Sequence, residues 1–136
     1  MSSTLALSKT WSQIILMEKL HDLEGIFELL NIRKSSVFTN YKPTHKLHEN
    51  YYSSGTHEYI DSIEVKPGEK ADVKVWLLSP KAYPNCIWVN RIIDICEGEK
   101  IIGKLKVTKI LNPILVVDPK NYKPIWVKPD IIELDL

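Results

Sequence analysis

Apolar and polar residues alternate with a period of two over much of the chain after about residue 35. Lys66-Pro67-Gly68-Glu69 places proline and glycine where a type II turn requires them. The residues that follow alternate across Ala71, Val73, Val75 and Leu77. This pattern predicts a half-buried β-strand that the chain enters through a tight turn.

A second group of apolar segments predicts a β-hairpin. Residues 87–95 are apolar and β-branched, and residues 101–111 alternate again after the turn residues 97–100. Gly98, like the glycine of the earlier turn, suits a backbone position with positive φ. Gly103 lies inside the second strand, where it suits a bulge or a tight barrel corner. Short strands separated by turns predict an all-β domain.

Residues 12–30 carry two conflicting signals. Apolar residues at alternating spacings of three and four follow one face of an amphipathic helix; they are Leu16, Leu20, Leu23, Phe27 and Leu30. Gly25 interrupts this stretch, and glycine in a helix interior costs about 1 kcal/mol relative to alanine. Two alternatives follow: one helix over residues 12–30, or a helix that ends near residues 22–25 and is followed by a strand, Ile26–Leu30.

The end of the chain, residues 113–136, is interrupted by proline. Four prolines lie between residues 113 and 129, and proline cannot donate a hydrogen bond to a β ladder. We therefore expect edge strands, or an extended tail packed on the outside of the domain.

Composition and charge limit the class of protein. The chain has 136 residues, of which 44% are hydrophobic and 26% charged, as in an ordinary globular domain. Its 18 basic and 17 acidic residues give a formal charge of +1, too little for binding that depends on broad attraction to nucleic acid. No signal peptide or membrane-spanning run is recognisable, and two cysteines are too few for a disulfide framework. We predict a cytoplasmic protein in which Cys86 and Cys96 are free thiols.

One candidate binding segment is basic. Lys42, His45 and Lys46 form a small cluster with His48 after a proline, inside a predicted surface loop over residues 39–48. Histidines three residues apart in a strand would point to opposite faces, and no further ligand is nearby, so no metal site is predicted.

A second candidate segment is aromatic. Tyr51 and Tyr52 precede Ser53-Ser54-Gly55, and small residues beside paired tyrosines are typical of an exposed recognition loop. This predicts a second contact loop over residues 51–57. A search for a nucleophile elbow, a zinc-binding His-Glu-x-x-His and a catalytic Cys/His pair finds none, so we predict neither enzymatic activity nor a cofactor.

Five elements occur in a characteristic order between residues 23 and 112. They are Leu23–Leu30, Phe38–Pro43 with its Tyr-Lys-Pro step, the Pro-Gly turn Val65–Glu69, Val73–Pro80, and Glu97–Leu111 with its Glu-Gly start and Ile-Gly step. In this order the segment resembles the C-terminal β-barrel domain of elongation factor Tu and related translational GTPases. The resemblance implies a small closed antiparallel β-barrel over residues 23–112, flanked in a single domain by residues 1–22 and 113–136.

The resemblance also implies contact residues. Thr44 falls at a position that contacts tRNA in the family, and Glu97 and Gly98 at the family's Glu-Gly. Lys42 and Cys96 stand where the family has arginine, which weakens a tRNA role because only arginine forks toward phosphate. The chain lacks the glycine-rich phosphate-binding loop of a GTPase, so no nucleotide binding follows.

These observations lead to one preferred function and two alternatives. The preferred function is a non-catalytic protein-binding module, such as an adaptor or an immunity-type protein that imitates the translation-factor domain. The alternatives are an RNA-binding accessory protein in translation, with tRNA as its ligand, and a purely structural domain. The predicted contact residues are Lys42, Thr44, His45, Lys46, Tyr51, Tyr52, Glu97 and Gly98.

Overall fold

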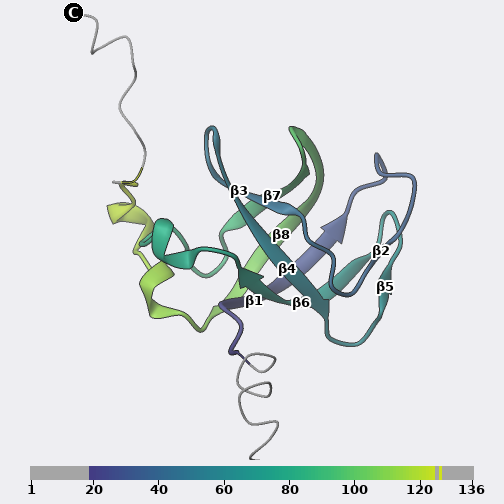
Figure 1. The fold of residues 1–136 in the computed structure, drawn as a ribbon, viewed down its shortest axis with the longest axis horizontal. Coiled ribbons are helices and arrows are strands. Elements are labelled where there is room, and N and C mark those ends of the chain that lie inside the picture. Colours follow the sequence, from purple (N-terminus) through teal and green to yellow (C-terminus); the bar gives the residue numbers. More distant parts are fainter. Residues whose placement is uncertain (1–18, 125, 127–136) are drawn as a thin grey trace, which may run out of the picture.

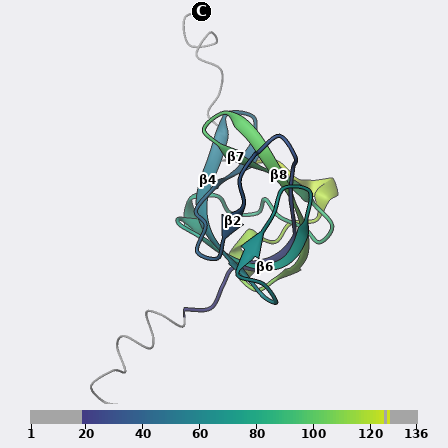
Figure 2. The same cartoon turned by 90° about the vertical axis from the view of Figure 1, so that its right-hand side faces the viewer.

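A computed structural model describes residues 19–124 and residue 126. Six antiparallel strands form a closed barrel in the order β1-β6-β4-β3-β7-β8 (Figures 1 and 2). The barrel strands are β1 (Leu23–Leu29), β3 (Thr44–His48), β4 (Tyr51–Tyr59), β6 (Lys70–Leu77), β7 (Ile92–Glu97) and β8 (Lys100–Ile110). A separate two-stranded sheet pairs β2 (Val37–Phe38) with β5 (Glu64–Val65). The all-β closed barrel predicted from the sequence is confirmed.

Alternation along each strand separates the core from the outer surface. In β1, Leu23, Gly25, Phe27 and Leu29 are buried, while Glu24, Ile26 and Glu28 point outward. The same pattern in β6 buries Val73, Val75 and Leu77. Because successive strand residues point to opposite faces, every strand sends one set of side chains into the barrel and leaves the other outside.

The single helix over residues 12–30 is wrong for residues 23–29, which form β1. β1 pairs with β6 on one side and β8 on the other, so tertiary hydrogen bonds override the local helical spacing. Gly25 supports this arrangement, because a Cβ atom there would meet the Lys106 carbonyl oxygen and lie 2.8 Å from Leu105 Cδ1. The strand of the second alternative is present and begins three residues early; residues 12–18 lie outside the described residues.

The turn glycines adopt the predicted conformation. Gly68 has φ +88° and Gly98 has φ +62°, both in the left-handed region that favours glycine. Gly103 lies at a close approach between strands, since a Cβ atom there would lie 2.6 Å from Phe27 Cε1. The β7–β8 register shifts beside it, between Ile95 and Cys96. The predicted hairpin therefore exists, although its first strand begins at Ile92 rather than at residue 87.

Residues 113–122 correct the expectation of edge strands or an outer tail. They contain two 3₁₀ turns, η2 (Pro113–Leu115) and η3 (Pro119–Asn121). Residues 85–87, which follow a third 3₁₀ turn, η1 (Pro80–Ala82), form hydrogen bonds with η2. The backbone amides of Cys86 and Ile87 both donate to the Leu115 carbonyl, and the Leu115 side chain is fully buried. The segment therefore reaches the core through Leu115, the one buried residue among residues 113–122, because a proline-led 3₁₀ turn can bury a side chain without supplying a β ladder.

Candidate functional site

Most of the two predicted contact loops belongs to barrel strands. Residues 51–57 lie in β4, so the second loop prediction is wrong, and the first is wrong for residues 44–48, which form β3, while residues 39–43 lie outside the barrel strands. The small residues of β4 serve packing: a Cβ atom at Gly55 would lie 2.7 Å from the His45 ring. Ser53 is buried and accepts a hydrogen bond through its carbonyl oxygen. Small side chains thus indicate a crowded interior here rather than a flexible loop.

His45 lies inside the barrel, not in a basic cluster on its surface. Its Nδ1 is 2.9 Å from the Ser53 carbonyl oxygen, which can only accept, so Nδ1 carries the proton. Its Nε2 lies 2.9 Å from Nε2 of His57 and must accept from it, which leaves His57 Nδ1 as a buried acceptor without a partner in the described structure. Burial lowers the pKa of His45 to about 4 and holds that of His57 well below its usual value. Both rings are therefore neutral at pH 7.

Glu97 is held by neighbouring side chains at the end of β7. The Arg33 guanidinium donates to both carboxylate oxygens at 3.1 Å, and the Tyr41 hydroxyl donates to one of them at 2.6 Å. Burial opposes ionisation of Glu97, but these hydrogen bonds outweigh it and lower the pKa of the carboxyl group. Gly98 forms the adjacent turn. The structure therefore assigns Glu97 an intramolecular role.

Tyr51 belongs to an aromatic cluster that joins β3 and β4 to Tyr83 and Trp126. Its ring meets Trp126 edge to face at 5.3 Å, and Trp126 also meets Tyr83 and His48. The Trp126 indole donates to the Pro84 carbonyl. Edge-to-face contacts of this kind are a favourable arrangement of aromatic rings, so the cluster packs Tyr51 against its neighbours.

The remaining predicted residues lie on the outer surface in two places. Lys42 lines a shallow hollow of about 320 Å³ with Trp76 and Leu78. Thr44 donates to the Cys96 carbonyl across β3 and β7. Lys46 and Tyr52 face one another across β3 and β4. The eight predicted residues therefore do not form one site.

Both cysteines are buried free thiols, as predicted. Burial raises the pKa of Cys86 to about 11 and also raises that of Cys96, so neither favours the reactive thiolate. In the described part of the chain, no group of three or more His, Cys, Asp or Glu side chains could hold a metal ion. No helix among the described residues is long and apolar enough to cross a membrane.

A charged row crosses the outer face of the barrel. The strand register pairs each residue of this row with the next across β3, β7, β8, β1 and β6. In that order the residues are Lys46, Asp94, Lys104, Glu28 and Lys70. Their charges alternate in sign, and Lys104 Nζ lies 2.5 Å from Asp94 Oδ1. Opposite charges directly across strands stabilise a sheet.

A second row, two residues further along each strand, contains exposed isoleucines. Ile92 faces Lys106, which faces Ile26, which faces Asp72. The Ile60 amide donates to the Asp72 carbonyl, which places Ile60 next in this isoleucine row. Ile92 is 62% exposed, Ile60 45% and Ile26 37%. The row thus exposes branched apolar side chains on a face that the barrel core does not use.

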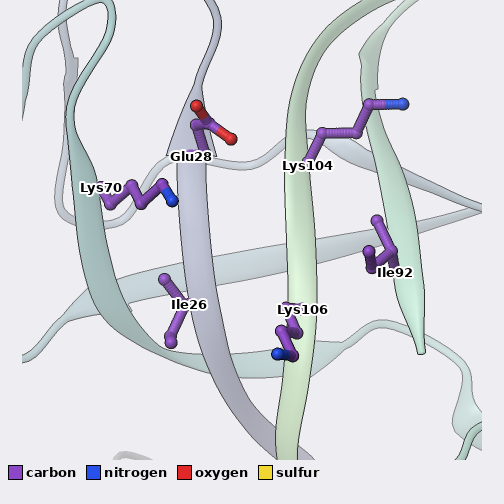
Figure 3. A pocket seen from close by; sticks show the side chains of 6 residues that line it. All are labelled: Ile26, Glu28, Lys70, Ile92, Lys104 and Lys106. Carbon is purple, nitrogen blue, oxygen red and sulfur yellow. The ribbon is translucent and has the colours of Figure 1, made fainter. Parts of the chain in front are cut away.

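The two rows enclose an open hollow of about 500 Å³ on the outer face of β6, β1, β8 and β7 (Figure 3). Figure 3 shows Lys104 extended toward β7, with Ile26 and Ile92 on either side of β8. The hollow is lined by Ile26, Glu28, Lys70, Ile92, Lys104 and Lys106. We take this hollow as the candidate site.

Sequence reasoning missed this hollow, although one signal of it was present. In Leu23–Leu29 the outward positions are Glu24, Ile26 and Glu28, so an isoleucine occupies the polar phase of the alternation. Exposed apolar residues at such positions are informative when they gather on one face. No known protein-family model matches the chain, and comparison with curated proteins likewise found no match.

Proposed function

We propose that this chain is a non-catalytic protein-binding module whose contact surface is the outer face of β6, β1, β8 and β7. The isoleucine row carries the proposal: three exposed isoleucines lie in one register row beside an open hollow. Branched side chains there add nothing to the barrel core, and clustered apolar exposure is a common feature of protein interfaces.

The charge pattern of this face favours a protein partner over RNA. Carboxylates alternate with lysines in the charged row, and Asp72 lies in the isoleucine row. Phosphates along an RNA backbone would meet repulsion at each carboxylate, whereas a protein can place both charge signs opposite such a row. A cytoplasmic adaptor or immunity-type protein built on a translation-factor-like barrel remains our interpretation of the sequence resemblance.

Affinity capture from the native cytoplasm tests this proposal, with protein and RNA both identified in the eluate. The test variant is Ile26→Thr/Ile92→Thr, since threonine keeps the β-branched shape of isoleucine while removing apolar surface. The matched control is Ile63→Thr, at a residue that is 75% exposed and does not line the hollow. We expect a protein that is captured by the wild type and the control and lost from the double variant.

Two results would contradict the proposal. One is a captured protein that the double variant retains at full yield. The other is tRNA as the main captured species, which would favour the RNA-binding alternative.

A further inference from the structure

The hollow has unused positive charge. Of its three lysines, Lys104 is held by Asp94. Lys70 and Lys106 form no ion pair with any other described residue. Both are exposed on the outer face, at opposite corners of the hollow, and Glu28 is the single carboxylate of the lining. The hollow therefore offers two ammonium groups to a ligand.

The apolar part of the hollow is formed by Ile26 and Ile92, which lie on either side of Lys106. Ile26 and Ile92 stand on β1 and β7, with β8 between them, so their backbones are about 10 Å apart at the usual strand spacing of a sheet. Lys106 lies between them in the same register row, so one aliphatic side chain resting on the Lys106 stem would contact both isoleucines. Lysine stems commonly supply such apolar contact while the charged end remains in water.

Charge complementarity then defines the partner. Resting on the function proposed above, we propose that the hollow binds an acidic segment of the partner protein in which carboxylates flank one branched aliphatic residue. The aliphatic side chain rests on the Lys106 stem between Ile26 and Ile92, and the flanking carboxylates pair with the ammonium groups of Lys70 and Lys106. The lysines supply the preference for acidic sequences, and the isoleucines supply contact that salt does not screen.

Titration of the isotope-labelled protein with a synthetic peptide, Glu-Asp-Ile-Asp-Glu with both ends blocked, tests this inference. We expect shifts of the Ile26 and Ile92 amide resonances, and weaker binding at higher salt. Two comparison peptides separate the contributions: Glu-Asp-Gly-Asp-Glu lacks the aliphatic side chain, and Lys-Lys-Ile-Lys-Lys reverses the charge.

A pair of variants with equal net charge locates the binding. Lys70→Glu/Lys106→Glu is expected to weaken binding of the acidic peptide by at least about tenfold, because each exposed attraction becomes a repulsion. Lys81→Glu/Lys120→Glu makes the same charge change at exposed residues of η1 and η3, outside the hollow, and is expected to change affinity by less than about threefold.

The possible results separate this inference from the proposed function. Equal weakening by both variants, equal binding of the reversed peptide, or no shift at Ile26 and Ile92 overturns the acidic-segment proposal. If a partner protein is still lost from the isoleucine variant in the capture experiment, the proposed function stands and only the partner chemistry is wrong. If no protein depends on the isoleucines while the acidic peptide binds, the proposed function fails instead.

Discussion

Lowering the pH from 7 to 5 is expected to remove at least about 2 kcal/mol from the free energy of unfolding, through the buried pair His45 and His57. Both rings are fully buried and neutral in the folded protein. In the unfolded chain each imidazole titrates at a pKa of about 6.5. The unfolded state therefore binds more protons below that pH, and stability falls with pH.

The magnitude follows from the difference in pKa. At pH 5 an unfolded histidine is protonated, while His45, whose folded pKa is about 4, remains mostly neutral. Each pH unit below 6.5 costs about 1.4 kcal/mol for one histidine, so His45 alone loses about 2 kcal/mol by pH 5, and His57 adds to this loss in the same direction. His57 has its pKa lowered by burial and by the neighbouring His45. Stability present above pH 6.5 is thus lost as the pH falls toward 4, a large loss for a domain of ordinary stability.

Urea unfolding followed by tryptophan fluorescence at pH 7, 6 and 5 measures this loss. His45→Gln/His57→Gln removes both titrating groups and is expected to flatten the dependence on pH, and each single substitution should reduce it. His48→Gln is the matched control, because His48 lies on the same strand outside the core. A loss below about 1 kcal/mol between pH 7 and 5 in the wild type, or an unchanged loss in the double variant, would refute the buried neutral pair.

Two further predictions concern single positions. Gly103→Ala is expected to cost about 3 kcal/mol in urea unfolding, because its Cβ would press against Phe27 and a backbone oxygen. Gly98 has open space around it and φ +62°, so Gly98→Ala should cost only about 1 kcal/mol. A larger loss of stability in Gly98→Ala than in Gly103→Ala would contradict the close contact at Gly103. The Arg91 guanidinium donates to two backbone carbonyls and lies 4.9 Å from the centre of the Trp88 ring. Arg91→Lys should therefore lower the free energy of unfolding by about 2 kcal/mol, because lysine would leave one carbonyl unpaired. An unchanged midpoint of urea unfolding would contradict this bridging role.

Local patterns in the sequence were enough to predict much of the barrel. Alternation over residues 71–77 and 101–111 identified β6 and β8, and Gly68 and Gly98 identified turns with positive φ. These features depend on residues adjacent in the chain: side chains two apart share a face of a strand, and a positive φ strains most residues other than glycine. The closed all-β fold follows from them because short amphipathic strands must bury one face each.

The tertiary structure alone decided the identity of β1 and the surroundings of the predicted contact residues. The helical spacing around residues 23–29 gives way to hydrogen bonds from β6 and β8, which come from distant parts of the chain. His45 appears basic and exposed in the sequence, yet the phase of β3 turns it inward against His57. Pairing with the neighbouring strands decides which alternate side chains of β3 face the core. The sequence of this segment alone therefore could not show whether His45 is exposed.

The candidate hollow shows most clearly which features the sequence determines and which depend on the tertiary structure. Its two isoleucines lie 66 positions apart in the chain, at residues 26 and 92, and meet only through the register of β8 between them. The sequence determined that each of them is an apolar residue in a predominantly polar phase of its strand. Only the order and register of the strands bring them together beside Lys70 and Lys106, because pairing between distant strands is a property of the whole chain and no local pattern encodes it.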